Sequence, residues 1–212
     1  MHIQLLSTRS QTGKAAILQA IKEAANRAQP EDVFIFYVAG HGQTTDRDGY
    51  QMMTADVRNL AAQSVRENSI TADELQRAVY NVPSARKVIL LDTCQSGEGI
   101  DVSKLLSRPE VHAQDNRDMM NRIKRKSGAM VLAAAQSKEQ ALEGYKGHGI
   151  FTYALLEGLE GKADSNKDGL VSTFELQEYV MKRADQLAEQ VYGRAQQPYP
   201  AALSGFDVVR WR

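Results

Sequence analysis

The chain has 212 residues, and its 26 Lys and Arg residues balance its 26 Asp and Glu residues, which gives a formal net charge of zero. This balance argues against a partner held by charge alone, such as nucleic acid or an anionic membrane surface. The length suits one domain over residues 1–212, and the single cysteine, the short apolar runs and an N-terminus without a signal-peptide pattern make the cytoplasm the default expectation.

The first predicted elements are a short strand that begins at Ile3 and an amphipathic helix with apolar residues at helical spacing from Ala15 to Ala25. A strand over 33–38 follows and leads to a histidine that stands between two glycines. Thr71, with Glu74 three residues later, forms the capping-box pattern that starts a helix.

The next predicted strand is the apolar run Val88–Leu91, which is typical of a strand buried on both faces. A strand over 129–134, helices over 151–159 and 174–190, and an extended tail after Pro198 complete the chain. Because strands alternate with helices, the sequence predicts an α/β fold with a mostly parallel sheet and helices on both faces.

Two of these strands end in residues that can carry out chemistry. Cys94 follows the run 88–91, and His41 follows the strand 33–38. In open parallel sheets, ligands and catalytic residues collect at the carboxyl ends of the strands. Taken singly, the cysteine fits a small buried hydrophobe and the histidine fits a solvated loop residue. Together they fit the thiol and imidazole of a Cys–His nucleophile.

The sequence resembles the caspase-like cysteine peptidases, a group that contains caspases, metacaspases and their bacterial relatives. The matching segments are FIFYVAGHG (34–42), LLDTCQSG (90–97), VLAAAQSKEQALE (131–143) and GHGIFTYALLEGLEGKAD (147–164). The histidine and cysteine motifs come in the family's order, roughly 50 residues apart. The resemblance implies a three-layer caspase-like fold and the activity of a cysteine-type endopeptidase.

The resemblance also implies that the chain is N-terminally incomplete relative to the family, and the alternatives are a truncated gene product, a fragment and a domain that rearranges its sheet. Family members usually start with another strand and helix before the position of Ile3, and that first strand lies inside the sheet. Without it, the strand at Ile3 and the strand at Val33 have no shared neighbour. The alternative to an active peptidase is therefore a catalytically inactive caspase-fold fragment that acts as a binding or scaffold module.

The family's mechanism implies a role for each matching residue. Cys94 is expected to be the nucleophile and His41 the general acid and base. The backbone N–H groups of Gly42 and Cys94 are expected to form the oxyanion hole, and Gly42 suits this because no side chain blocks the approach. This chemistry requires no cofactor.

Asp92 is the candidate for substrate recognition, because metacaspases also have an aspartate two residues before the cysteine. A carboxylate there would bind an Arg or Lys side chain before the scissile bond, so protein or peptide substrates with basic residues are the expected partners. Gln136 and Ser137 could line the same pocket by resemblance. The competing interpretation makes Asp92 a cap of the strand-to-helix turn. The sequence leaves the oligomeric state open.

The segment 164–175 matches the pattern of an EF-hand calcium loop and lies between two predicted helices. The residues at the ligand positions are Asp164, Asn166, Asp168, Leu170, Ser172 and Glu175. EF-hands normally work in pairs, whereas this loop is alone in the sequence. The alternatives are a Ca²⁺ site and a turn in which the same side chains cap a helix without an ion.

Overall fold

The fold is built on a six-stranded mixed sheet. The computed structural model describes residues 1–45, 49–95, 129–134, 142–196, 198–201 and 205–211. The strand order is β3-β2-β1-β4-β5-β7. Its bounds are Val33–Thr45 for β1, Gly49–Met52 for β2, Ile70–Thr71 for β3, Arg86–Gln95 for β4, Ala129–Ala133 for β5 and Tyr199–Ala201 for β7.

The three central strands are parallel, as the sequence predicts, and the strands at the edges are antiparallel. β4 pairs in parallel with β1 on one side and with β5 on the other. β2, β3 and β7 each run antiparallel to a neighbour. β1 and β2 are joined by a short connection, which suits an antiparallel pair, because a parallel neighbour would need a long crossover.

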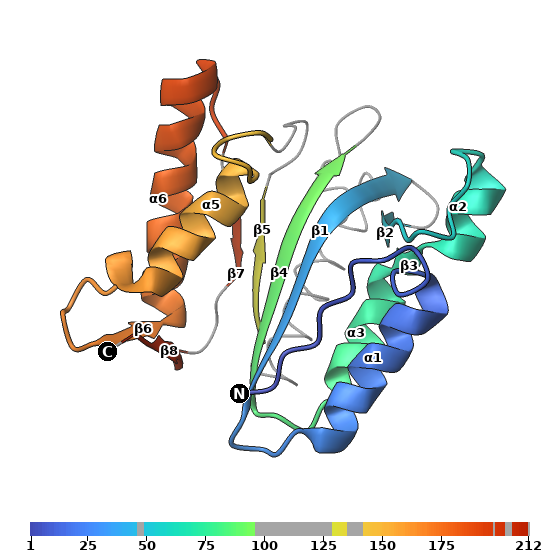
Figure 1. Cartoon of the computed structure of the whole chain (residues 1–212), viewed down its shortest axis with the longest axis horizontal. Helices are drawn as coiled ribbons and strands as arrows, with labels where there is room; N and C mark the ends of the chain where they lie inside the picture. The colour runs from blue at the N-terminus through green and yellow to red at the C-terminus, as the bar shows by residue number, and fades with distance from the viewer. Residues whose placement is uncertain (46–48, 96–128, 135–141, 197, 202–204, 212) are drawn as a thin grey trace, which may run out of the picture.

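Helices cover both faces of the sheet, which confirms the three-layer arrangement (Figure 1). Helices α1 (Lys14–Arg27) and α3 (Ala72–Tyr80) lie on one side, and α5 (Ile150–Glu157) and α6 (Thr173–Tyr192) lie on the other. The predicted capping box of Thr71 and Glu74 starts α3. The short helix α2 (Ala62–Asn68) and the π-helical turn η1 (Gly158–Lys162), which continues α5, complete the set.

The cysteine-bearing strand β4 is buried on both faces because its side chains alternate between two cores. Val88 and Leu90 belong to the core formed with α5 and α6, and Ile89 belongs to the core formed with α1 and α3. In a strand, alternate residues point to opposite faces, so a continuous apolar run is what a central strand of a three-layer fold requires.

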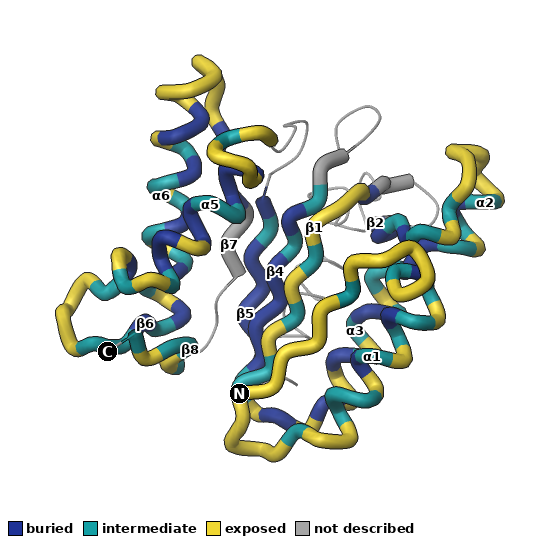
Figure 2. The backbone as a smooth tube through the Cα atoms, in the orientation of Figure 1, coloured by how far each residue is buried: buried dark blue, intermediate teal, exposed yellow. Residues whose placement is uncertain are grey.

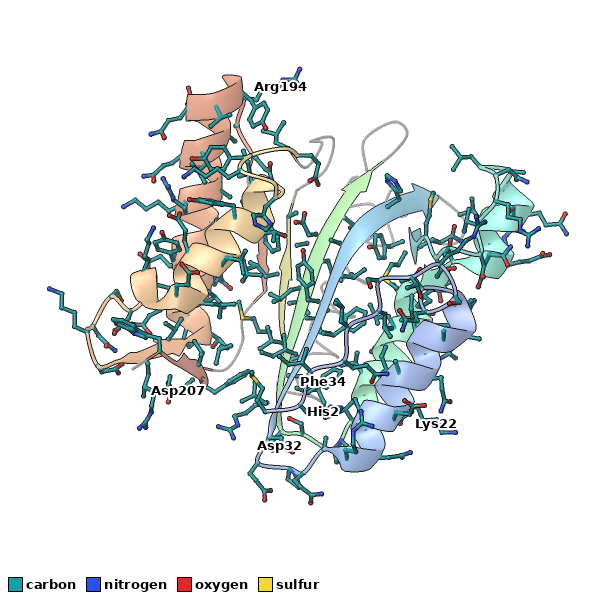
Figure 3. The ribbon with its side chains drawn as sticks, in the orientation of Figure 1. His2, Lys22, Asp32, Phe34, Arg194 and Asp207 are labelled. Atoms are coloured by element: carbon teal, nitrogen blue, oxygen red, sulfur yellow. The ribbon has the colours of Figure 1, made fainter. Side chains whose placement is uncertain are left out.

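The strand predicted at Ile3 is absent, and that prediction was wrong. Residues 1–7 have no regular secondary structure, and Ile3 is 73% exposed. β1 pairs with β2 only over Gly42–Thr45, so Val33–Gly40 is paired with β4 alone among the described residues. In Figure 3, His2 comes from this N-terminal segment and Phe34 from β1. With no ladder between the two, the segment has no partner that would make it a strand.

One face of β1 is also uncovered. Ile35 is 47% exposed and Tyr37 and Ala39 are exposed as well, whereas the neighbouring strands β4 and β5 are mostly buried (Figure 2). α5 and α6 therefore cover the β4–β5–β7 side of the sheet more completely than the β1 side (Figures 1 and 2).

The C-terminal residues form a second, two-stranded sheet. β6 (Leu170–Ser172) pairs antiparallel with β8 (Asp207–Arg210). In Figure 3, Arg194 lies near the end of α6 and Asp207 lies near the opposite end of that helix. The chain between them returns along the large sheet as β7, antiparallel to β5. No helix among the described residues has the length and apolar composition needed to cross a bilayer.

Candidate functional site

The histidine and the cysteine lie side by side at the ends of two neighbouring strands. The parallel register of β1 and β4 runs from Val33 opposite Arg86 to Gly42 opposite Gln95, and it places His41 directly opposite Cys94. Paired strands are about 4.8 Å apart, so the two backbones meet at that spacing. Both strands extend past the end of β5 in Figure 1, and His41 is exposed.

The alternation of side chains along a strand puts positions 41 and 94 on the same face of the sheet. On β1, Tyr37 precedes His41 by four residues, and on β4, Asp92 precedes Cys94 by two, so each pair shares a face of the sheet. The hydroxyl groups of Tyr37 and Thr152 of α5 are 2.7 Å apart, which identifies the α5 face. The positions of His41 and Cys94 therefore continue the α5-facing row to its exposed end.

Tyr50 of β2 packs under this rim from the α1 and α3 side, a role that the sequence did not reveal. Its ring is buried, and its hydroxyl donates to Thr93 Oγ1 over 3.0 Å. Burial raises the pKa of Tyr50 to about 12, against the hydrogen bond with Thr93, so the phenol stays neutral. A Cβ on Gly42 would lie 2.7 Å from Tyr50 Cε2. Gly42 is thus required for this close packing, in addition to its predicted oxyanion role.

Asp92 is buried, with 4% of its surface exposed, and it contacts the first turn of α5. Its Oδ2 accepts a short hydrogen bond from the Thr152 hydroxyl. Because that hydroxyl has one proton, Tyr37 is the donor in its contact with Thr152. Asp92 Oδ1 is buried and has no hydrogen-bond partner among the described residues. A buried carboxylate oxygen without a donor can receive one from a ligand.

A second carboxylate, that of Glu143, lies close to Asp92. A Cβ on Gly149, the residue before α5, would be 3.1 Å from Asp92 Oδ2 and 3.1 Å from Glu143 Oε2. Burial raises the pKa of Asp92, the negative charge of Glu143 raises it further, and hydrogen bonds from Thr152 act in the opposite direction. The two acidic groups therefore border the same glycine at the N-terminus of α5.

The structure changes the competing interpretation of Asp92. The helix terminus that Asp92 contacts is the N-terminus of α5. There the backbone N–H of Thr152 also favours the ionised form of the Asp92 carboxyl group. An acidic group at a helix N-terminus is stabilised by the helix dipole. Asp92 can therefore tie α5 to β4 and still offer Oδ1 to a ligand. Gln136 and Ser137, the other predicted pocket residues, lie outside the described part of the chain.

The EF-hand-like loop lies between η1 and α6, far along the chain from the rim. Asp164 Oδ2 accepts from the Gly169 N–H and the Trp211 indole, at 2.9 and 3.1 Å. Glu175 forms a capping box with Ser172 at the start of α6. Burial opposes ionisation, but backbone N–H groups hold the pKa values of Asp164 and Glu175 below their usual range.

The remaining predicted ligands of the loop take part in the same hydrogen bonding. Asn166 Oδ1 accepts from the Asp168 N–H, and Asp168 Oδ1 accepts from the Leu170 N–H, both at 2.9 Å. Among the described residues, no group of three or more His, Cys, Asp or Glu side chains is arranged to hold a metal ion. The loop is thus closed by its own hydrogen bonds, as the helix-capping interpretation expects.

Comparison with known proteins supports the same fold. A family model described as "Caspase domain" matches residues 6–205. The chain is 31% identical over 111 residues to Metacaspase-1A of Aspergillus oryzae, which covers 51% of this chain and 26% of that protein. It is 32% identical over 110 residues to Metacaspase-1A of Aspergillus terreus, covering 50% of this chain and 27% of that protein.

A solved structure adds evidence for the fold alone. The crystal structure of a Geobacter sulfurreducens protein superposes with a TM-score of 0.53 at 17% sequence identity, and it covers 94% of this chain and 74% of that one. The match to each metacaspase spans about a quarter of that protein's length.

Proposed function

The chain belongs to the Caspase domain family, and from this premise we propose that it is a cysteine endopeptidase that cuts peptide bonds after Arg or Lys. The observation that carries the proposal is the register of β1 and β4, which pairs His41 with Cys94 at the exposed end of the sheet. In this proposal Cys94 is the nucleophile and His41 transfers the proton.

The chemistry follows from this pairing. A free thiol has a pKa of about 8.5, so a neighbouring imidazole is needed to increase the thiolate fraction at neutral pH. The Cys94 sulfur attacks the carbonyl carbon of the substrate while His41 takes the thiol proton. His41 then gives that proton to the leaving amine, and water hydrolyses the thioester. The N–H groups of Gly42 and Cys94 would stabilise the oxyanion.

The preference for a basic residue rests on Asp92. Its Oδ1 is buried without a partner among the described residues, which suits a donor supplied by a guanidinium or ammonium group. The carboxylate of Glu143 beside it adds negative charge at the same place. An acidic substrate side chain would meet like charges there and be rejected.

A fluorogenic peptide that ends in Arg before the leaving group tests the proposal. We expect wild type to release the fluorophore and Cys94→Ala to release none, with His41→Ala reduced by several orders of magnitude. A matched peptide that ends in Asp should be cut poorly. Intact, folded wild type that releases no fluorophore from any peptide refutes the peptidase proposal.

The competing proposal, a caspase-fold binding or scaffold module without activity, is favoured by two features of β1: its exposed face, and an edge over 33–40 that pairs with no other strand in the described part of the chain. An exposed strand edge offers unpaired N–H and C=O groups to another chain. The same peptide assay separates the two functions, because a binding module needs no intact Cys94 and a peptidase does.

Calcium binding at the loop 164–175 is a separate proposal that rests on its donor types and its place between two helices. The closed hydrogen bonding of the loop and the lack of a carboxylate cluster among the described residues weigh against it. Calorimetry decides the matter. Heat of binding in wild type that is lost in Glu175→Gln supports a calcium site, and no heat at millimolar calcium removes it.

A further inference from the structure

Gln196 is a polar residue in a fully buried position, with 0% of its surface exposed. It lies in the short connection after α6, whose C-cap is Gly193, and before β7. Both ends of its side-chain amide are used. Nε2 donates to the Ala134 carbonyl over 3.0 Å, and Oε1 accepts from the Leu142 N–H over 2.9 Å.

These two backbone groups stand on either side of residues 135–141. Ala134 directly follows β5, and Leu142 resumes the described chain on the way to α5. An amide has one donor end and one acceptor end, so Gln196 can bond a carbonyl and an N–H at once. Asparagine is one methylene shorter, and methionine has the right length but no donor. Neither of these residues could therefore make both bonds.

The segment that Gln196 holds is also attached to both helices of the α5 face. The Leu142 carbonyl accepts from the Ile150 N–H at the start of α5, over 2.8 Å. The Glu143 carbonyl accepts from the Tyr192 hydroxyl in the last turn of α6. Leu142 and Glu143 are thus fixed from three directions, and Gln196 is the attachment that joins them to the end of β5.

We propose that Gln196 is a positioning residue of the substrate site, which fixes Leu142 and Glu143 against β5 and so holds the Glu143 carboxylate beside Asp92. The two carboxylates border Gly149, where a Cβ would be 3.1 Å from an oxygen of each. Gln196 acts through Leu142 and touches no substrate. The proposal rests on the proposed function for the nature of the ligand, a basic side chain, but not for the attachment itself.

Two measurements on three proteins test it: wild type, Gln196→Met, and the matched control Gln190→Met, which changes an exposed glutamine of α6. Hydrogen exchange reports on the attachment. Because Gln196→Met removes the acceptor of the Leu142 N–H, that amide should exchange about tenfold faster or more, and the control should match wild type. Unchanged exchange at Leu142 in Gln196→Met overturns the proposal.

Peptide kinetics report on the site. In Gln196→Met we expect KM for the Arg peptide to rise about tenfold, which corresponds to about 1.4 kcal/mol, with kcat within a factor of about two. A purely structural role would lower the melting temperature and the active fraction with KM unchanged, and that result overturns the proposal.

Failure of the proposed function is distinguishable from failure of this inference. If wild type cuts no peptide, the peptidase proposal is refuted, and titration of benzamidine, an amidinium analogue of the arginine side chain, replaces the kinetics. Benzamidine that binds wild type and Gln196→Met equally well, or binds neither, overturns the positioning role.

Discussion

The close contact between Gly42 and Tyr50 gives the sharpest test of how the rim is built. In Gly42→Ala the new Cβ would lie 2.7 Å from Tyr50 Cε2, about 0.7 Å inside the 3.4 Å at which ordinary contact begins. Backbone conformation is not the reason for this glycine, because its φ is not among the positive values of the chain. The substitution therefore tests packing alone.

The magnitude follows from the surroundings of the ring. Tyr50 is buried and hydrogen-bonded to Thr93 of β4, so it cannot move aside freely. Overpacking a core typically costs about 1–3 kcal/mol. If the Tyr50–Thr93 bond also breaks, about 0.5–1.5 kcal/mol is added. We expect Gly42→Ala to lower the free energy of unfolding by about 2–4 kcal/mol.

Gly40→Ala is the matched control, because it flanks His41 on the other side and its Cβ would meet no atom within 4 Å. That variant should be as stable as wild type or gain up to about 1 kcal/mol. Urea unfolding followed by circular dichroism measures both. Since Gly42→Ala keeps its backbone N–H, a fall in kcat in that variant reports a displaced oxyanion donor or an approach blocked by the new methyl group, rather than a lost donor.

A double variant separates the contact from other effects. Tyr50→Leu removes the ring, so the cost of Gly42→Ala in that background should shrink by about 1 kcal/mol or more. Gly42→Ala and Gly40→Ala that are equally stable, or costs that add without coupling, refute the reasoning that Tyr50 supports the rim through Gly42.

Three further predictions concern single side chains. Burial and the charge of Glu143 raise the Asp92 pKa, so the folded protein binds the carboxyl proton more tightly than the unfolded chain does. The contribution of Asp92 to folding stability is therefore lost as the pH rises from the pKa of the unfolded carboxyl group through the raised pKa of the folded one. Asp92→Asn should therefore be no less stable than wild type in urea at pH 7, while KM for the Arg peptide rises roughly 30-fold for about 2 kcal/mol of lost pairing; an unchanged KM contradicts the role of Asp92. Glu157, buried between α5 and α6, has a pKa that burial raises but that Arg183 holds below 4.5 overall. Glu157→Gln should lose about 1–3 kcal/mol at pH 7, a difference that shrinks as pH falls through that lowered pKa, and urea unfolding that shows the same difference at pH 3 and pH 7 would count against it. Tyr50→Phe should cost about 0.5–1.5 kcal/mol in the same assay, because only the bond to Thr93 is lost.

The sequence was enough to locate the candidate catalytic residues, because the ends of buried strands are marked by local changes from apolar to polar residues. An apolar run that stops at Gly40, and another that ends at Leu91, three residues before Cys94, indicate where two buried strands end, and the family motifs give their order. Capping boxes are equally local, so the start of α3 was predicted from Thr71 and Glu74, and the structure shows the same pattern in Ser172 and Glu175 at the start of α6. The prediction of a strand at Ile3 was wrong because a strand forms only where another strand pairs with it.

Only the tertiary structure determined the contacts between segments that are far apart in the chain. Three such contacts build the site. The strand register places His41 opposite Cys94, Thr152 and Glu143 lie close to Asp92, and Gly42 packs against Tyr50. No local pattern specifies which partner a buried amide such as Gln196 will find. Hydrophobic spacing determines which face of an element is buried, whereas the identity of the neighbour depends on how all the elements pack together.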